Sequence, residues 1–190
     1  MTQTDPTRKQ LYNLYFLRHG QSIANENRIF AGQQDVSMTD HGLEQAARSG
    51  EAIKGSSIIF DTIISSPLQR AYQTARTVAS IIEYPEADIL VNPQLMERGM
   101  GMFEGELLDT MAGVFEEEKE LKGVESLNSL SSRALQIVKT LDSEYTQGEN
   151  VLLVSHAGFG RMLQTMIAHQ SPDKMYDQEP IPNSTLIKLI

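Results

Sequence analysis

The sequence predicts an α/β protein with a mostly parallel central sheet that helices cover on both faces. Short apolar runs rich in Ile, Leu and Val alternate with segments that carry apolar residues at helical spacing. Alternating strands and helices of this kind form βαβ units, whose strands lie parallel. The 190 residues suffice for one domain with a substantial core, and neither an internal repeat nor an interdomain linker interrupts them.

Five segments are predicted as strands because they are short and rich in β-branched and other apolar residues. Four helices are predicted from apolar stripes at spacings of three and four residues. The strands are residues 11–17, 58–66, 87–93, 150–156 and 184–190, and the helical stripes cover 43–53, 71–82, 134–141 and 160–169. Thr39 is a suitable N-cap for the first helix, and the acidic stretch 106–122 is predicted as a helical excursion beside the sheet.

Composition and charge exclude several classes of protein. Without cysteine the chain can form no disulfide, thiolate metal site or cysteine nucleophile. A net charge of −9 is opposite to the basic surface that nucleic-acid-binding proteins usually present.

The polar start of the chain predicts a flexible N-terminus over residues 1–10, within a single domain that spans 1–190. This segment lacks the apolar centre of a signal peptide, and no apolar run approaches the roughly 20 residues of a membrane span. We therefore expect a cytoplasmic protein with neither nucleic-acid nor membrane partners.

Charged groups stand where several predicted strands end. Arg18 and His19 directly follow the first strand, and Arg70 opens the helix after the second. His156 ends the fourth, and Glu97 stands in the Gly-rich segment ERGMGMFEG after the third. Because ligands of open α/β sheets bind beyond the carboxyl ends of the strands, we expect these five side chains to share one pocket.

This set of residues suits the transfer of a phosphoryl group. Two guanidinium groups present forked donors to phosphate oxygens, and an imidazole can act as the nucleophile. A single carboxyl group among cations would serve to move a proton to the leaving oxygen. The sequence contains neither a Walker motif nor the clustered aspartates of two-metal phosphatases, so we expect no metal ion and no cofactor.

These residues lie in motifs that resemble those of the histidine phosphatase superfamily, the phosphoglycerate-mutase-like proteins. LRHGQSIAN is similar to R-H-G-x-[ST]-x-x-N, ISSPLQRAYQTA to SSPLxRAxxTA, LMERGMGMFEG to LxExxxGxxEG, and VLLVSHAGFGR to VLVVSHGGxxR. MTDHGLEQA, GVESLNSLSSR and PNSTL resemble further motifs of the family. The resemblance covers most of the chain in the family's order. It implies a three-layer α/β/α sandwich that uses no metal or nucleotide cofactor.

The resemblance implies a role for each matching residue. The imidazole of His19 would be the nucleophile, and the carboxyl group of Glu97 the general acid. The residues that would hold the phosphoryl group are Arg18, Ser22, Asn25, Arg70 and His156, the last of which also counts as catalytic. Candidates for the rest of the substrate pocket are Gln21, Arg98, Met100, Met102 and Ala157. Glu104 and Glu106 are rivals of Glu97, and the spacing to MFEG favours Glu97.

Three functions stay open on the sequence. We expect a phosphatase that acts on a small-molecule phosphomonoester through a phosphohistidine on His19. Mutases of this family carry a long basic insertion after the acid, whereas this chain has a short acidic stretch with two lysines there. The alternatives are a cofactor-dependent phosphoglycerate mutase and a catalytically weak phospho-ligand-binding protein, which would be expected to lose His19 or the acid. An exposed edge strand would allow a homodimer.

Overall fold

The structure of the protein is a computed structural model that describes residues 12–111 and 122–190. The predicted flexible N-terminus (1–10) lies outside the described residues, as does most of the acidic stretch predicted to be helical. In the described part of that stretch, residues 108–111 form a short 3-10 helix, η4 (Leu108–Met111).

Five strands form one sheet in the order β3-β2-β4-β1-β5. The strands β1 (Tyr12–Arg18), β2 (Thr62–Ser65), β3 (Leu90–Val91) and β4 (Glu149–Ser155) run parallel to one another. The last strand, β5 (Leu186–Lys188), pairs with β1 in the antiparallel direction. The predicted mostly parallel sheet is therefore confirmed.

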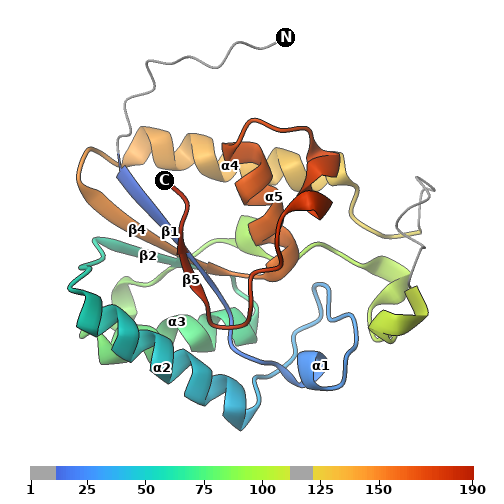
Figure 1. The fold of residues 1–190 in the computed structure, drawn as a ribbon, viewed down its shortest axis with the longest axis horizontal. Helices are drawn as coiled ribbons and strands as arrows, with labels where there is room; N and C mark the ends of the chain where they lie inside the picture. The colour runs from blue at the N-terminus through green and yellow to red at the C-terminus, as the bar shows by residue number, and fades with distance from the viewer. Residues whose placement is uncertain (1–11, 112–121) are drawn as a thin grey trace.

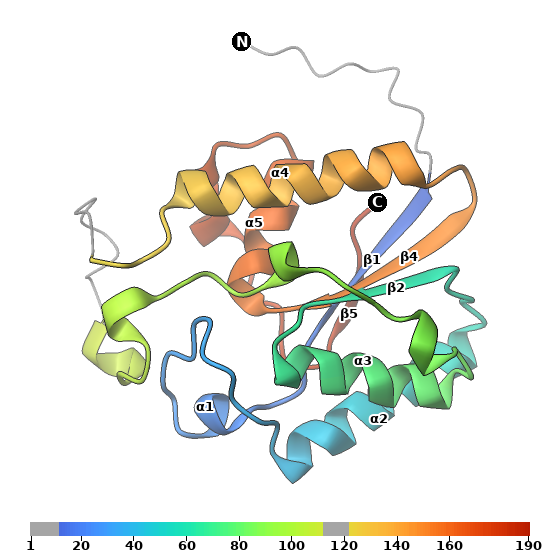
Figure 2. The same ribbon diagram turned by 180° about the vertical axis from the view of Figure 1, so that it is seen from behind.

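Two pairs of helices cover the two faces of the sheet, so that the molecule has three layers (Figure 1). The helices α2 (Asp40–Ser56) and α3 (Gln69–Ile81) lie side by side on one face. The helices α4 (Leu127–Glu144) and α5 (Ala157–Ile167) lie on the other, and Figure 2 shows the same layers from behind. The predicted α/β/α sandwich is confirmed.

Alternate residues of the central strands face the two helical layers because side chains alternate along a strand. Leu14 and Phe16 of β1 pack into a core with α4 and α5, whereas Leu17 packs into a second core with α2 and α3. All three side chains are fully buried. The apolar run ahead of Arg18 is thus a strand buried on both faces, as parallel sheets require.

The helices α2, α3 and α5 begin two or three residues before their predicted stripes, whereas α4 begins seven residues before, at Leu127. The Thr39 hydroxyl accepts a hydrogen bond from Gly42 N at the start of α2, as predicted for an N-cap. The N-cap residue of α3, Leu68, has no side-chain acceptor for the first turn. The carboxylate of Asp35 accepts a hydrogen bond from Gln69 N instead, at 2.7 Å. Helix α5 begins directly after β4, at Ala157, which is three residues earlier than its apolar stripe indicates.

Three observed strands, β2, β3 and β5, are shorter than the apolar runs that predicted them. The segment 87–93 contributes only β3, between the 3-10 helices η1 (Glu86–Asp88) and η2 (Pro93–Leu95). Pro93 has no N–H for a strand ladder, which ends the pairing.

Among the described residues no helix is both long and apolar enough to cross a membrane.

Candidate active site

The pairing register of the two central strands brings two histidines together. Arg18 at the end of β1 lies opposite Ser155 at the end of β4, so that the next residue of each chain segment leaves the sheet at the same level. These residues are His19 and His156, and their ring centroids are 5.1 Å apart. The predicted meeting of the two strand-end histidines is therefore what the structure shows.

The tautomer of His19 follows from its hydrogen bond. Its Nδ1 lies 2.6 Å from the carbonyl oxygen of Gly20, and because a carbonyl only accepts, Nδ1 carries the proton. The lone pair of Nε2 is then available to attack an electrophile. Burial, followed by the charges of Arg70 and Arg18, holds the pKa of His19 well below its ordinary value of 6.5. The ring is therefore neutral at neutral pH, which a nucleophile requires.

His156 lies behind His19 and is fully buried. Its Nε2 lies 2.8 Å from the hydroxyl of Ser66, the residue that follows β2, while its Nδ1 is buried without a hydrogen-bond partner. Burial, and then the charge of Arg70, holds the pKa of His156 well below its ordinary value as well. An uncharged ring with one unsatisfied nitrogen can hydrogen-bond a phosphoryl oxygen.

The guanidinium groups of Arg18 and Arg70 lie at this end of the sheet, where Arg70 is buried and Arg18 is partly buried. Arg70, in the first turn of α3, donates to the carbonyl oxygens of Gly32 and Gln34, each at 2.8 Å, and so holds the loop that precedes α2. Arg18 donates to the carbonyl oxygen of Ile181 at 2.7 Å, and its Nε is buried without a partner. Burial lowers the pKa of both groups, and the charge of Glu97 opposes that shift.

The carboxylate of Glu97 is held by three backbone N–H groups. It accepts hydrogen bonds from the amides of Arg98 at 2.8 Å, Phe159 at 3.0 Å and Gly158 at 3.1 Å. The last two belong to the first turn of α5, whose partial positive charge favours an anion. A Cβ at position 158 would lie 2.5 Å from the carboxylate, so a larger residue there would displace the carboxylate from these amides.

The backbone of the Glu97 loop is held by Arg133 from α4. Its guanidinium pairs with both carboxylate oxygens of Glu125, at 2.7 and 2.8 Å, and the pair is largely buried. The remaining N–H groups donate to three carbonyl oxygens of the loop, those of Gln94, Met96 and Glu97. All five donors of Arg133 are thus satisfied, three of them by the segment that carries the acid.

Ser22 and Asn25 form the start of the short helix α1 (Ile23–Glu26). Ser22 is its N-cap, and a capping box links the two side chains to each other's backbone N–H groups. The amide of Asn183 also donates to the Asn25 side-chain oxygen, at 3.1 Å. Both residues line the cavity described next, as predicted.

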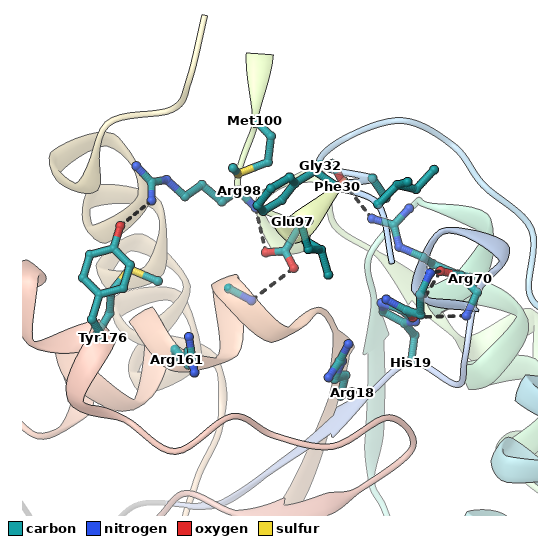
Figure 3. Close-up of a pocket in the computed structure, with 17 residues that line it drawn as sticks. Arg18, His19, Phe30, Gly32, Arg70, Glu97, Arg98, Met100, Arg161 and Tyr176 are labelled. Carbon is teal, nitrogen blue, oxygen red and sulfur yellow. Dashed lines mark hydrogen bonds between the residues drawn. The ribbon is translucent and has the colours of Figure 1, made fainter. Parts of the chain in front are cut away.

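The site residues surround a cavity of about 260 Å³ (Figure 3). Eight of the predicted residues line it, and His156 is not among them: Arg18, His19, Ser22, Asn25, Arg70, Glu97, Arg98 and Met100. The rival carboxylates Glu104 and Glu106 do not line it. Glu104 instead accepts from the backbone amides of Gln33 and Met100 and so shapes the loops.

Three residues predicted for the substrate pocket do not line this cavity: Gln21, Met102 and Ala157. The side-chain oxygen of Gln21 accepts from the Thr39 hydroxyl at 2.9 Å, which directs the amide toward the start of α2. Met102 is 62% exposed on a 3-10 helix, η3 (Gly101–Phe103), outside the cavity. Ala157 opens α5, whose cavity-lining residues are Gly158 and Arg161.

Sequence reasoning missed several residues of the cavity wall. Arg161 is the last letter of the motif VLLVSHAGFGR, and its place one turn into the helix after His156 was the available signal. Phe30 and Tyr176 also line the cavity, and no motif marks either. Tyr176 lies in η6 (Pro172–Asp177) and accepts a hydrogen bond from Arg98 at 2.8 Å. Within the described ranges, no group of three or more His, Cys, Asp or Glu side chains is placed to hold a metal ion.

Comparison with known proteins agrees with this geometry. Residues 14–189 match the model of the histidine phosphatase superfamily, branch 1. A 2,3-bisphosphoglycerate-dependent phosphoglycerate mutase of Parvibaculum lavamentivorans is 30% identical over 173 residues, which cover 85% of this chain and 82% of the relative. A broad-specificity phosphatase of Saccharomyces cerevisiae is 28% identical over 172 residues, covering 85% and 72%.

Solved structures with a similar fold include a phosphatase. A mycobacterial glucosyl-3-phosphoglycerate phosphatase, solved as a complex with VO3, superposes with a TM-score of 0.80 at 22% sequence identity, covering 93% of this chain and 92% of that one. The family model matches nearly the whole chain. The chain belongs to branch 1 of the histidine phosphatase superfamily.

Proposed function

We propose that this protein is a phosphomonoester hydrolase that works through a phosphohistidine on His19 and needs no metal ion. One observation carries the proposal. The Gly20 carbonyl holds the proton on Nδ1 of a neutral His19 ring, which leaves Nε2 free beside Arg18 and Arg70. A nucleophile with this tautomer, next to two guanidinium groups, is suited to accept a phosphoryl group.

In the first step, the lone pair of His19 Nε2 forms a bond to phosphorus while the bond from phosphorus to the leaving oxygen breaks. The guanidinium groups of Arg18 and Arg70 stabilise the charge on the other phosphoryl oxygens. Protonated Glu97 gives its proton to the leaving oxygen, so that the alcohol departs neutral.

In the second step, water attacks the phosphorus of the phosphohistidine. The carboxylate of Glu97 takes a proton from the water, the bond from phosphorus to Nε2 breaks, and inorganic phosphate is released with His19 neutral again. The same carboxyl group thus gives and then takes one proton in each cycle. The phosphatases among its relatives support hydrolysis.

The test is the release of phosphate from p-nitrophenyl phosphate in the presence of EDTA. We expect turnover by the wild type and a loss of at least about 10⁴-fold in His19→Ala, because the covalent route is removed. Phosphohistidine should also be trapped by rapid acid-free quenching of the wild type with ³²P-labelled substrate. An unlabelled protein that still turns over, or a His19→Ala variant with full activity, would overturn the mechanism.

A phosphoglycerate mutase is the second candidate, since the Parvibaculum relative bears that name. A mutase would have to retain a doubly phosphorylated intermediate, whereas the cavity is about 260 Å³ and the sequence from Glu106 to Lys122 holds only two lysines. Interconversion of 3- and 2-phosphoglycerate that 2,3-bisphosphoglycerate stimulates, at a rate above phosphate release, would assign the mutase instead. Phosphate-dependent binding without turnover of either kind would indicate a binding protein.

A further inference from the structure

The free nitrogen of His19 depends on the direction of one backbone carbonyl group. Nδ1 of His19 lies 2.6 Å from the carbonyl oxygen of Gly20, and this contact holds the proton on Nδ1. A neutral imidazole carries its proton on either nitrogen, and the hydrogen bond at one nitrogen decides which. If the Gly20 carbonyl turned away, the proton would no longer be confined to Nδ1, and Nε2 would lose its lone pair whenever it carried the proton.

The residue at position 20 leaves that carbonyl free to turn. A Cβ there would lie 2.3 Å from the carbonyl oxygen of Gly42, so the close packing of this loop against the start of α2 excludes a side chain. Glycine, however, allows more rotation about its backbone bonds than any other residue. The peptide that follows Gly20 therefore needs a contact that holds its plane.

Gln45 of α2 contacts that peptide. Its Oε1 accepts a hydrogen bond from the backbone N–H of Gln21 at 2.8 Å. Because a backbone N–H only donates, the oxygen of the Gln45 amide must face it, and Nε2 of the same amide then donates to Nε2 of His41 at 3.1 Å. Gln45 is half-buried and stands in the motif MTDHGLEQA, which has no part in the proposed mechanism.

The carbonyl group of Gly20 and the N–H of Gln21 form one rigid unit. They belong to the same trans peptide bond, which is planar, so they point in opposite directions within a single plane. A hydrogen bond that fixes the N–H therefore fixes the carbonyl group as well. The two hydrogen bonds also strengthen each other, because both polarise the peptide in the same direction.

Other contacts hold the peptides on either side. The N–H of Gly20 donates to the Thr74 hydroxyl at 3.0 Å, and the carbonyl oxygen of Gln21 accepts from the Thr39 backbone N–H, also at 3.0 Å. These contacts fix where the loop lies on α2 and α3. Gln45 differs from both, because it acts on the peptide plane that the imidazole contacts.

We propose that Gln45 is a positioning residue that sets the tautomer of His19 through the peptide between Gly20 and Gln21. The hydrogen bonds run from Oε1 of Gln45 to one edge of the peptide and from its other edge to Nδ1 of His19. The inference rests on the proposed function, because the tautomer matters to the reaction only if Nε2 attacks phosphorus. Gln45 does not line the cavity, so phosphate binding does not depend on it.

The test compares Gln45→Met, whose side chain is of similar length and has no acceptor oxygen, with Gln45→Glu, which keeps an oxygen for the Gln21 N–H. The tautomer is read from ¹⁵N chemical shifts and two-bond ¹H–¹⁵N couplings of protein made with ¹⁵N-labelled histidine, and His19→Gln identifies the signals of His19. The rate of the first step is the release of nitrophenolate from p-nitrophenyl phosphate in a single turnover, which needs little help from an acid.

We expect the wild type and Gln45→Glu to show one tautomer of His19, with the proton on Nδ1, and to release nitrophenolate at similar rates. Gln45→Met should show both tautomers in exchange and release nitrophenolate about 10- to 100-fold more slowly, as when an outer partner of a functional imidazole is lost. The inhibition constant of inorganic phosphate should be unchanged, because Arg18 and Arg70 are untouched.

Arg48→Met is the control on the same helix. The side chain of Arg48 is exposed, with its guanidinium 3.6 Å from the Glu44 carboxylate, and its replacement should change neither the tautomer nor the rate. Thermal unfolding compares the stability of the variants, since a variant that is only less stable keeps a single tautomer in its folded molecules.

A single tautomer with the proton on Nδ1 in Gln45→Met would overturn the inference, as would nitrophenolate release by that variant at the wild-type rate. A Gln45→Glu variant with the signals and the rate of Gln45→Met would also overturn it, because the acceptor oxygen would then not be the feature that matters.

The two proposals fail separately. If the wild type hydrolyses no p-nitrophenyl phosphate, the proposed hydrolase is wrong, and the tautomers of His19 in the wild type and in Gln45→Met still decide whether Gln45 holds the ring. If hydrolysis occurs and the tautomer does not respond to Gln45→Met, only the positioning role of Gln45 is wrong.

Discussion

The two walls of the cavity are built in different ways. The strand-end wall comprises Arg18 and His19, with the buried His156 beside them, and continues directly from hydrogen-bonded parallel strands. The acid-loop wall, residues 97–108, contains the short 3-10 helix η3 and is held by side chains that reach it from other segments. The sheet therefore places the nucleophile, whereas individual side-chain contacts place the proton donor. The substitutions below change residues of one wall, or residues that support it, and leave the other wall in place.

The largest effect on the acid-loop wall is expected from Glu97→Gln. We expect kcat for glycerol 3-phosphate to fall by about 10²- to 10⁴-fold, because an alkoxide leaves slowly without a proton donor. Hydrolysis of p-nitrophenyl phosphate should fall far less, since nitrophenolate needs little protonation. The matched control is Glu106→Gln, in the same loop, exposed and outside the cavity, which should not change the ratio of the two rates. Equal slowing of both substrates by Glu97→Gln would remove the acid role.

Arg133 is a positioning residue whose loss should act through Glu97. In Arg133→Met combined with Glu125→Gln, no buried carboxylate is left unpaired, and the loop loses three hydrogen bonds to its carbonyl oxygens. We expect kcat for glycerol 3-phosphate to fall by about 10- to 100-fold, as for a displacement of about 1 Å of a catalytic group. A variant that is only destabilised would lose activity toward both substrates equally. The measurement is therefore the ratio of the rate with glycerol 3-phosphate to the rate with p-nitrophenyl phosphate.

A matched control for this double variant is the exposed pair of Arg28 and Asp109, whose ion pair is 2.6 Å long. Replacing Arg28 by Met removes a guanidinium–carboxylate contact at the surface and should leave both rates within about twofold, because exposed ion pairs contribute little. If the Arg133 variant behaves like the Arg28 variant, the positioning role is wrong.

The strand-end wall should make stability depend on pH. The pKa values of His19 and His156 lie well below 6.5 in the folded protein, so between their folded and unfolded values the unfolded state binds protons that the folded state does not. The free energy of unfolding should therefore fall as pH falls below 6.5, by up to about 1.4 kcal/mol per pH unit for each histidine. Above pH 6.5 this contribution is constant.

Urea unfolding at a series of pH values between 7.5 and 5 measures this dependence. His156→Asn removes one of the two groups and should reduce the slope below pH 6.5 by about 1.4 kcal/mol per pH unit where both histidines contribute fully. A slope identical to that of the wild type would show that His156 titrates alike in the folded and unfolded states.

The smallest effect is expected at Met102, which is 62% exposed on the acid-loop wall. Met102→Ala should change the free energy of unfolding by no more than about 0.5 kcal/mol, as surface substitutions usually do. Met100→Ala is its contrast, because Met100 is buried beside the cavity and truncation of a buried side chain costs about 2 kcal/mol or more. Similar losses at both positions in urea unfolding would contradict the difference in burial.

The sequence by itself determined the fold class and most of the strand-end wall. Apolar runs rich in β-branched residues mark buried strands, and parallel strands present their carboxyl ends at one edge, so Arg18, His19, Arg70 and His156 could be grouped before any coordinates. Glu97 followed from the spacing of its motif. These predictions depend on local patterns and on one general rule of sheet topology.

The tertiary structure decided which way the loop side chains point. Gln21 is drawn to Thr39, Met102 faces outward, and the unpaired guanidinium of Arg161 enters the cavity. The hydrogen bond from the Arg133 guanidinium to the Glu97 carbonyl oxygen likewise joins residues that are 36 positions apart in the chain. Such orientations depend on hydrogen bonds and packing between distant parts of the chain, and residues in irregular segments carry no periodic pattern from which to read them.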